Sequence, residues 1–265
     1  MEGRVVLVTG ATSGLGRQLA RDLALRGATL LLHGRERSRL DAIAEEVRAW
    51  TPAVRTYVAD FADLDQVGRL AAAVRRDEPR LDVLVNNAAV GGGDRMVGRQ
   101  GHELRLTVNH LASHLLAWRL APLLRASAPA RVVNVASMGQ ERIDFDDLML
   151  SRDYDGVRAY CRSKLAMIMG SFDLAEELRP DRITVNAVHP AHLMDTPMVR
   201  GSGLMPVATV HDGALPTLRL IIDHALADVT GRYFDRFDDA HAHEQAYDPV
   251  ARRRLREVTR ELTRG

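Results

Sequence analysis

The stretch Val5-Val6-Leu7-Val8-Thr9-Gly10-Ala11-Thr12-Ser13-Gly14-Leu15-Gly16 decides the fold of this 265-residue chain. Four apolar residues typical of a buried strand run into a glycine-rich turn, and a helical apolar pattern (Leu15, Leu19, Leu23) follows. Glycines let such a turn approach a pyrophosphate, which the free N–H groups at the helix N-terminus receive. The spacing is GxxxGxG, not GxGxxG, and the turn alone is weak evidence. Together with its strand and helix, it favours nucleotide binding over a plain turn.

Short apolar runs alternate with helical patterns along the whole chain. Strands are predicted at residues 5–8, 29–32, 54–58, 83–85, 132–135, 183–188 and 233–234. Runs that are apolar on both faces, with helices between them, are typical of a parallel sheet covered on both sides. We therefore predict one doubly wound α/β domain of Rossmann type over residues 1–265, with a seven-stranded parallel sheet. Its cofactor half would span about 1–136 and its catalytic and substrate half about 137–265.

Composition argues against several classes of protein and partner. A formal net charge of +1 gives no reason to expect nucleic acid or an anionic membrane as partner. The apolar runs are far shorter than the roughly 20 residues of a membrane span, and the N-terminus enters the first strand without a signal peptide. The one cysteine, Cys161, fits a reducing compartment. We expect a cytoplasmic protein.

Lys164 is the one lysine among 36 lysine and arginine residues. Tyr160 lies four residues earlier on the same helical pattern, so both side chains leave one helix face. An ammonium is a compact point charge that fits beside a hydroxyl, which the wider guanidinium does not. A positive charge about 4 Å from a phenol, at an effective dielectric near 20, contributes roughly 4 kcal/mol, or about three pKa units before desolvation is subtracted. The pair predicts proton transfer by Tyr160.

The end of the second strand indicates the type of cofactor. Gly34 stands where enzymes that prefer NAD place a carboxylate, and Arg35 follows it. An arginine there suits the 2′-phosphate of NADP. We predict NADP, with NAD left open because Glu36 can bind a ribose.

Polar residues also follow the other strands. Asp60-Phe61 and Asn86-Asn87-Ala88 would reach an adenosine, or else cap helices and satisfy loop backbone. Ser137 places a hydroxyl after the fifth strand. Asn109 lies in a helical pattern from His102 to about Ala126, where its amide needs a specific partner such as a backbone carbonyl or an ordered water.

His110 and His114 share the i, i+4 spacing of some metal ligands. HExxH sites carry a glutamate after the first histidine, and no third ligand is indicated here. Packing or capping is therefore favoured, and we predict no metal.

With these residues together, the chain resembles the short-chain dehydrogenase/reductase superfamily over nearly its whole length. The glycine-rich turn, Asn86-Asn87-Ala88, and the order of Asn109, Ser137, Tyr160 and Lys164 carry the resemblance. Within the superfamily, the segments 108–111 and 145–148 and the tail around Asp248-Pro249 are similar to the retinol dehydrogenase-like and protochlorophyllide reductase-like branch.

The resemblance implies a catalytic tetrad of Asn109, Ser137, Tyr160 and Lys164. Tyr160 would protonate the nascent alkoxide as NADPH delivers hydride, Ser137 would orient the carbonyl, and Lys164 would also hold the nicotinamide ribose. Asn109 would position a water that connects Lys164 to solvent. The implied cofactor residues are Gly10, Thr12, Ser13, Gly14, Leu15, Gly16, Arg35, Asp60, Phe61, Asn87, Ala88, Tyr160, Lys164 and Pro190.

Three positions depart from the pattern of the family. Ala89 and Ala191 replace glycines, and Thr196 lies one residue further on than usual, which weakens its expected contact with the nicotinamide carboxamide. The N-terminus also lacks the membrane-anchoring segment of many retinol enzymes. Retinoids are therefore not taken as the substrate.

The predicted substrate pocket is apolar and adaptable. Its substrate contacts would be Met138, Tyr154, His192 and Met194, among wider candidates Val90, Met96, Ile143, Leu193, Met198 and Leu204, with Asp94 and Arg95 as further polar contacts. The connection from His189 to Pro206 suits a lid. We predict reduction of a ketone or aldehyde of a hydrophobic or aromatic small molecule, or oxidation of the alcohol, in specialised metabolism.

Two other functions use the same fold. One is an NAD(P)-sensing binding protein without chemistry, which need not keep a complete proton relay. The other is a nucleotide-sugar epimerase or dehydratase, which also uses a Tyr-x-x-x-Lys pair but usually carries a larger C-terminal region. Relatives commonly pair through the helices that carry Asn109 and Tyr160, so we expect a homodimer or homotetramer.

Overall fold

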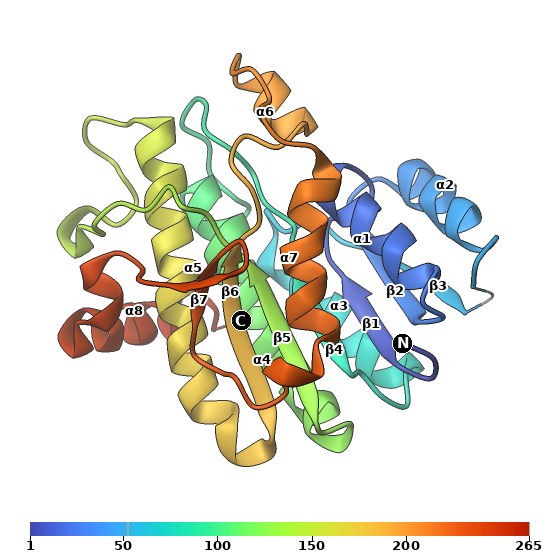
Figure 1. Ribbon diagram of the computed structural model, residues 1–265. Coiled ribbons are helices and arrows are strands. Elements are labelled where there is room, and N and C mark those ends of the chain that lie inside the picture. Colours follow the sequence, from blue (N-terminus) through green and yellow to red (C-terminus); the bar gives the residue numbers. More distant parts are fainter. Residues whose placement is uncertain (52, 265) are drawn as a thin grey trace.

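One sheet of eight strands, in the order β3-β2-β1-β4-β5-β6-β7-β8, forms the middle layer of the protein (Figure 1). The computed structural model describes residues 1–51 and 53–264. The parallel strands are β1 (Val5–Val8), β2 (Thr29–Gly34), β3 (Val54–Val58), β4 (Val83–Asn86), β5 (Ala130–Val135), β6 (Ile183–His189) and β7 (Tyr233–Asp235). The order reverses between β1 and β4, which creates the crevice where doubly wound sheets bind ligands.

The eighth strand, β8 (Asp238–Ala240), corrects the prediction of seven parallel strands. It pairs antiparallel with β7. Arg236, at φ +55°, makes the tight turn between the two. Both aspartates of β8 are exposed. A short, polar edge strand has no apolar run to reveal it in the sequence.

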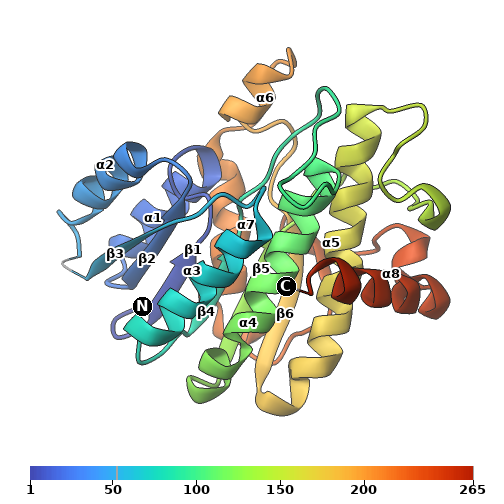
Figure 2. The same ribbon diagram turned by 180° about the vertical axis from the view of Figure 1, so that it is seen from behind.

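Helices cover both faces of the sheet. One face carries α1 (Gly14–Ala24), α2 (Arg37–Val47) and α7 (Val210–Ile222). The other carries α3 (Leu64–Asp77), α4 (Ala112–Ala126), α5 (Gly156–Leu178) and α8 (Pro249–Leu262), which Figure 2 shows from behind. The short α6 (Pro197–Gly201) projects beyond the carboxyl ends of the strands. Single turns occur at Leu106–Leu111 (η1), Phe145–Asp147 (η2), Arg179–Asp181 (η3), His224–Leu226 (η4) and Glu244–Tyr247 (η5).

The continuous apolar runs are explained by the two cores. Val5 and Leu7 enter the core beneath α3, α4 and α5. Val6 and Val8 enter the core beneath α1, α2 and α7. Because successive side chains of a strand point to opposite faces, a strand covered on both sides must be apolar at every position. The predicted fold class is confirmed.

A π-helical turn, η1, interrupts the long helix predicted from His102 to about Ala126, and it carries Asn109. Such turns are rare and occur frequently at functional sites. Apolar spacing gives little sign of one, because the added residue shifts the pattern only once and each side keeps the ordinary helical period.

Helix α8 packs across α5 and η1. Arg252 donates from Nε to Asp173 Oδ1 at 2.8 Å and from Nη2 to Glu176 Oε1 at 2.8 Å. His110 Nε2 and Thr259 Oγ1 lie 2.8 Å apart. Thus α8 occupies part of the face through which pairing was expected, and the oligomeric state remains a prediction.

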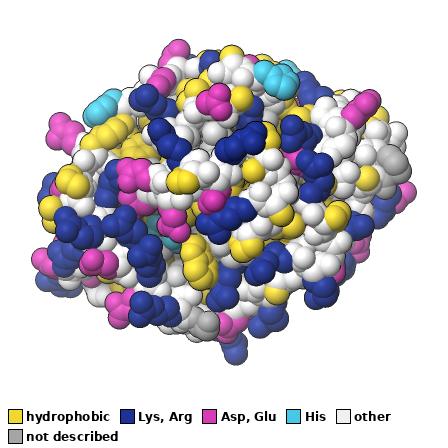
Figure 3. Space-filling view, turned by 90° about the horizontal axis from the view of Figure 1, so that it is seen from below, with side chains coloured by type: hydrophobic (Ala, Val, Ile, Leu, Met, Phe, Trp, Pro, Cys, Tyr) yellow, Lys and Arg dark blue, Asp and Glu magenta, His cyan; other side chains and the backbone are white. Residues whose placement is uncertain are grey.

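The face opposite α6 is not dominated by charge of one sign (Figure 3). Arginine and acidic side chains are interspersed on the face opposite α6 (Figure 3). Within residues 1–51 and 53–264, no helix combines the length and the apolar character that crossing a bilayer requires.

Candidate active site

Hydrogen bonds join the glycine-rich turn to the loop after β4. Asn87 Nδ2 donates to the carbonyl oxygens of Thr9 at 2.8 Å and Gly10 at 3.2 Å. Thr9 Oγ1 accepts from the backbone N–H of Asn87 at 2.9 Å and of Ala88 at 3.0 Å. A Cβ on Gly10, which has φ +64°, would lie 2.9 Å from Ala88 Cα. The two loops therefore approach so closely that a side chain at Gly10 would not fit between them.

Gly16→Ala is expected to destabilise the protein. A Cβ on Gly16 would collide with the carbonyl oxygen of Gly10 and lie 2.6 Å from Asn87 Nδ2. Overpacking against backbone costs about 1–3 kcal/mol or more. Gly68→Ala is the matched control, because no atom lies within 4 Å of a Cβ there and alanine favours the middle of α3 by about 1 kcal/mol. Denaturant unfolding should show opposite signs for the two variants; equal changes would contradict this account.

The turn fits a dinucleotide. Ser13, at the N-cap of α1, makes no side-chain cap bond, so the first N–H groups of the helix are available to an anion. Thr196 lies against the turn, with its Cγ2 3.0 Å from a Cβ built on Gly14. A Cβ on Gly34 would lie 2.6 Å from Thr12 Cγ2, so a side chain at that position would require Thr12 to shift. Arg35 follows with an exposed side chain, 3.8 Å from Glu36 Oε1.

His33 is a residue of this region that the sequence reasoning missed. Its ring stacks on Phe61 with 4.3 Å between centroids, its Nε2 lies 3.0 Å from Ala59 O, and Gly10 N donates to its Nδ1 at 3.3 Å. Burial lowers the pKa of His33 to about 4, so the ring is neutral. It joins β2 and β3 to the glycine-rich turn. A buried polar residue inside an apolar strand was the available signal.

The remaining polar residues at this edge divide between two roles. Asp60 Oδ1 accepts from Ala62 N at 2.9 Å, which shapes the loop after β3. Asn86 is buried and donates to Asn134 Oδ1 at 2.7 Å, so it belongs to the core behind the crevice. Asn86 thus has a structural role, but as a link from β4 to β5 and not as the helix cap or loop contact weighed from the sequence. Pro190 directly follows β6 and is buried at the same edge.

Tyr160 and Lys164 leave the first turns of α5 toward the end of β5. Asp155 Oδ1 caps this helix by accepting from Arg158 N at 2.7 Å. Lys164 is 2% exposed, and its Nζ donates to Val135 O at 2.8 Å. The same Nζ lies 5.7 Å from the centroid of the Tyr160 ring. The amine thus sits beside the phenol and inside the protein.

Burial dominates the acidity of both groups. It lowers the pKa of Lys164 to about 7. It also raises the pKa of Tyr160, and a hydrogen bond with the Ser137 side chain opposes that rise. A nearby positive charge alone would lower the pKa of the phenol, but desolvation outweighs that effect here. At neutral pH, Tyr160 therefore holds its proton.

Asn109 uses its whole amide within the protein. Its Oδ1 accepts from Val90 N at 2.8 Å, and its Nδ2 donates to Val90 O at 3.1 Å and to Ser163 Oγ at 2.8 Å. Ser163 Oγ donates to Tyr160 O at 2.7 Å. Asn109 therefore joins the loop after β4 to the helix of Tyr160. The water that it was expected to position remains a prediction.

Only some of the predicted substrate contacts lie together at the carboxyl edge of the sheet. Met138 and His192 are exposed at the carboxyl edge. Met194 packs against the core at α7, close to Gly213. Tyr154 donates its hydroxyl to Glu103 Oε1 at 3.0 Å. Of the wider set, Ile143 lies in the core, whereas Met96, Met198 and Leu204 are exposed.

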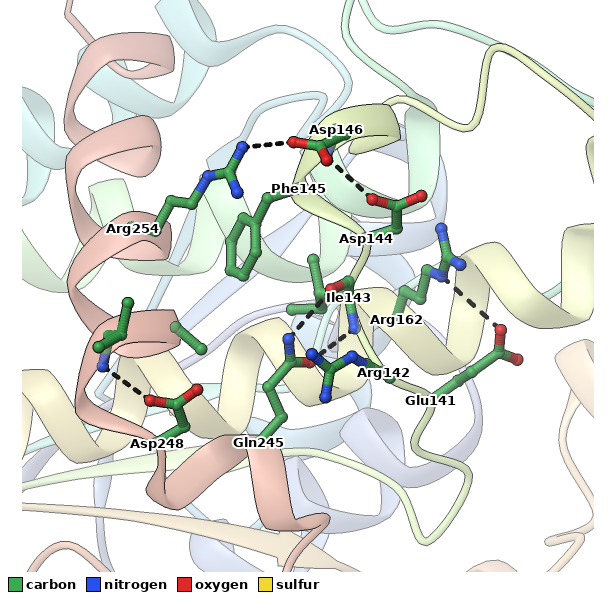
Figure 4. A pocket seen from close by; sticks show the side chains of 12 residues that line it. Glu141, Arg142, Ile143, Asp144, Phe145, Asp146, Arg162, Gln245, Asp248 and Arg254 are labelled. Atoms are coloured by element: carbon green, nitrogen blue, oxygen red, sulfur yellow. Dashed lines mark hydrogen bonds and ion pairs between the residues drawn. The ribbon is translucent and has the colours of Figure 1, made fainter.

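A cavity of about 430 Å³ lies elsewhere, between the β5–α5 loop and α8 (Figure 4). Gln245 spans its floor by bonding both backbone groups of Ile143, and Arg254 donates to Asp146 Oδ1 at 2.7 Å at its rim. None of the four tetrad residues lines it. The chemistry predicted from the sequence belongs to the crevice and not to this cavity.

His110 and His114 pack between η1, α4 and α5. His110 is buried and His114 is half-buried, and desolvation lowers their pKa to about 3 and about 4. His110 contacts Thr259 of α8 as described above. This contact is a packing role for His110, the alternative favoured from the sequence, and the absence of a metal stays a prediction.

The fold and this edge define a dinucleotide-binding α/β protein with a Tyr–Lys pair at its crevice. The family model for short chain dehydrogenases matches residues 4–205. Retinol dehydrogenase 13 of Homo sapiens is 35% identical over 96% of this chain and 82% of the relative. The chain therefore belongs to the short-chain dehydrogenase/reductase superfamily, in its retinol dehydrogenase-like branch. It is an NAD(P)-dependent oxidoreductase of carbonyls and alcohols.

Solved structures agree with this assignment. An uncharacterised protein of Mycobacterium paratuberculosis has a TM-score of 0.79 at 28% identity, covering 99% of this chain and 94% of that one. A short chain dehydrogenase of Escherichia coli CFT073, solved with NADPH, has a TM-score of 0.74 at 27% identity, covering 90% of this chain and 98% of that one.

Proposed function

We propose that the protein uses NADP(H) to reduce a ketone or aldehyde of a hydrophobic or aromatic small molecule, or to oxidise the corresponding alcohol. The observation that carries this proposal is the buried amine of Lys164 beside Tyr160 at the carboxyl edge of the sheet. Burying a lysine amine costs free energy, so a buried lysine at a ligand-binding crevice is a candidate functional residue. Several relatives are named for retinol, itself an apolar alcohol.

The protein's own groups would handle the proton. Bound NADPH would supply the hydride. Tyr160 would donate the proton from Oη to the substrate oxygen as negative charge develops there, and Ser137 Oγ would orient that oxygen by a hydrogen bond. The ammonium form of Lys164 would stabilise the phenolate left behind. Because burial raises the pKa of Tyr160, the phenol is protonated at neutral pH, which is the form that proton donation requires.

The cofactor would lie across the crevice between β1 and β4. The N-terminus of α1, from Ser13 to Gly16, would receive its pyrophosphate. Arg35, exposed at the end of β2, would pair with a 2′-phosphate. Gly34 supports NADP over NAD, because it offers no carboxylate to bind a free 2′-hydroxyl.

Arg35→Gln is expected to weaken NADPH binding about tenfold or more and to change NADH binding little, because charge-assisted hydrogen bonds to a phosphate are lost. Dissociation constants from cofactor fluorescence measure both. Arg48→Gln is the matched control at the far end of α2, where Arg48 pairs with Glu45 at 2.9 Å. Equal losses for the two cofactors in Arg35→Gln would contradict the assignment of NADP.

A carbonyl panel assayed with NADPH and NADH tests the substrate class. Turnover should be fastest with NADPH and apolar aromatic ketones or aldehydes. Preference for charged or sugar-like carbonyls would contradict it. Action on an intermediate of specialised metabolism and a cytoplasmic location also belong to the proposal; the latter is supported by the one cysteine.

A further inference from the structure

A buried carboxylate lies just before η1, and both of its oxygens are used. Glu103 is 1% exposed. Its Oε2 accepts from Leu106 N at 2.8 Å, at the start of the turn that carries Asn109. Its Oε1 accepts from the Tyr154 hydroxyl at 3.0 Å. One side chain therefore joins the start of η1 to the segment that leads into α5.

Arg105 extends this connection to the loop after β4. It is 4% exposed and lies 3.5 Å, from Nη1, from Glu103 Oε1. Its Nε donates to Gly91 O at 2.9 Å, and its Nη1 donates to Asp94 O at 2.7 Å. Its guanidinium carbon lies 5.8 Å from the centroid of the Tyr154 ring. Three separate segments of the chain thus meet at one buried ionic group.

The loop held by Arg105 has little freedom. A Cβ on Gly156, at the start of α5, would collide with Gly93 O. On the other side, a Cβ on Gly91 would lie 2.9 Å from Cγ of Met198, which belongs to α6. The Gly91–Gly93 loop therefore packs between α5, which carries Tyr160, and α6.

We propose that Glu103, Arg105 and Tyr154 form a positioning centre that holds the Gly91–Gly93 loop against α6 and so sets the size of substrate that reaches Tyr160. The inference rests on the proposed function. A buried ion pair is costly unless every partner is satisfied, and once satisfied it rigidifies its surroundings. Tyr154, predicted as a substrate contact, is reassigned here to positioning. Burial and the adjacent carboxylate raise its pKa to about 12, so its hydroxyl stays protonated and keeps donating.

The chain offers a matched control for this centre. Tyr57 of β3 donates its hydroxyl to Glu78 Oε1 at 2.7 Å, and Arg55 pairs with the same carboxylate at 2.7 Å. Glu78 follows α3, and this group touches neither η1 nor α5. Tyr57→Phe therefore removes the same kind of bond at a place without a role in the crevice.

Hydrogen exchange provides a test that does not depend on turnover. In Tyr154→Phe, amides of residues 88–98 and 104–111 should exchange about tenfold faster, because a hydrogen bond to a charged group is lost. They should be unchanged in Tyr57→Phe. Glu103→Gln removes the charge that faces buried Arg105 and leaves one oxygen to accept where Glu103 used two, so its amides should exchange faster still than those of Tyr154→Phe. Unchanged exchange in Tyr154→Phe, or equal effects in both tyrosine variants, would overturn the positioning centre.

Steady-state kinetics provide the second readout. Tyr154→Phe should change the ratio of KM for a bulky aromatic ketone to KM for a small ketone about tenfold, with kcat changed less and NADPH affinity unchanged. An equal loss of kcat for every substrate would overturn the role in substrate size. If wild type turns over no carbonyl, the proposed function fails, whereas hydrogen exchange still decides whether the centre positions the loop.

Discussion

Tyr160→Phe is expected to lower turnover about a thousandfold, the contribution of a well-placed general acid, while NADPH affinity stays within about threefold. The variant removes one oxygen from a ring packed on α5 and keeps the ring itself. Loss of a group that acts on the developing alkoxide lowers kcat and kcat/KM equally. Initial rates with NADPH and an apolar ketone, and cofactor titration, measure the two quantities.

Tyr57→Phe is the control for this prediction as well. It removes a phenol oxygen that bonds Glu78, remote from the crevice, and should leave kcat unchanged. Turnover of Tyr160→Phe close to that of wild type would reject Tyr160 as the acid. A large loss of cofactor affinity would instead show that the hydroxyl mainly holds the cofactor.

Lys164→Met is expected to abolish activity and to stabilise the protein at low pH. The folded-state pKa of Lys164 is about 7, against 10.5 for a free lysine. Because the folded pKa is lowered, the unfolded chain binds the extra proton between these values, and wild-type stability rises with pH across that window. The penalty is complete below about pH 7 and amounts to about 5 kcal/mol. Losing the bond to Val135 O offsets about 1–3 kcal/mol of it.

Denaturant unfolding of wild type and Lys164→Met, at about pH 6 and about pH 10, measures this difference. The variant should be more stable by a few kcal/mol at the lower pH, and the gain should vanish at the higher one. Lys164→Arg should be nearly inactive, because the wider guanidinium does not fit the same volume. If the variant were less stable than wild type at low pH, the ammonium of Lys164 would have to be stabilised in the folded protein by a compensating charge, which would contradict this account.

Much of this architecture could be predicted from local patterns. Strands covered on both faces must be apolar throughout, so runs such as Val5–Val8 reveal a parallel sheet. In such a sheet, residues that follow the strands meet at one edge, which explains why Asn87 and Ser137 were predicted near the crevice. The Tyr160–Lys164 spacing predicts a shared helix face because it is one helical turn.

The remaining features depend on contacts between distant segments. The eighth strand is too short and polar to form an apolar run, and η1 shifts the apolar pattern by a single residue. The hydrogen bond from Tyr154 to Glu103 joins residues 51 positions apart in the chain. Desolvation of Lys164 depends on how completely the fold closes over it. These properties arise from tertiary packing, which no local pattern contains.

Transfer of deuterium from NADPH, labelled at the transferable hydrogen of the nicotinamide ring, to an apolar aromatic ketone tests the central claim most directly. The account predicts deuterium on the carbinol carbon of the product with wild type, and none above background with Tyr160→Phe. NADPH that binds wild type but passes no label to any aldehyde or ketone of a broad panel, with no label returned to the cofactor from deuterated alcohols, would contradict it.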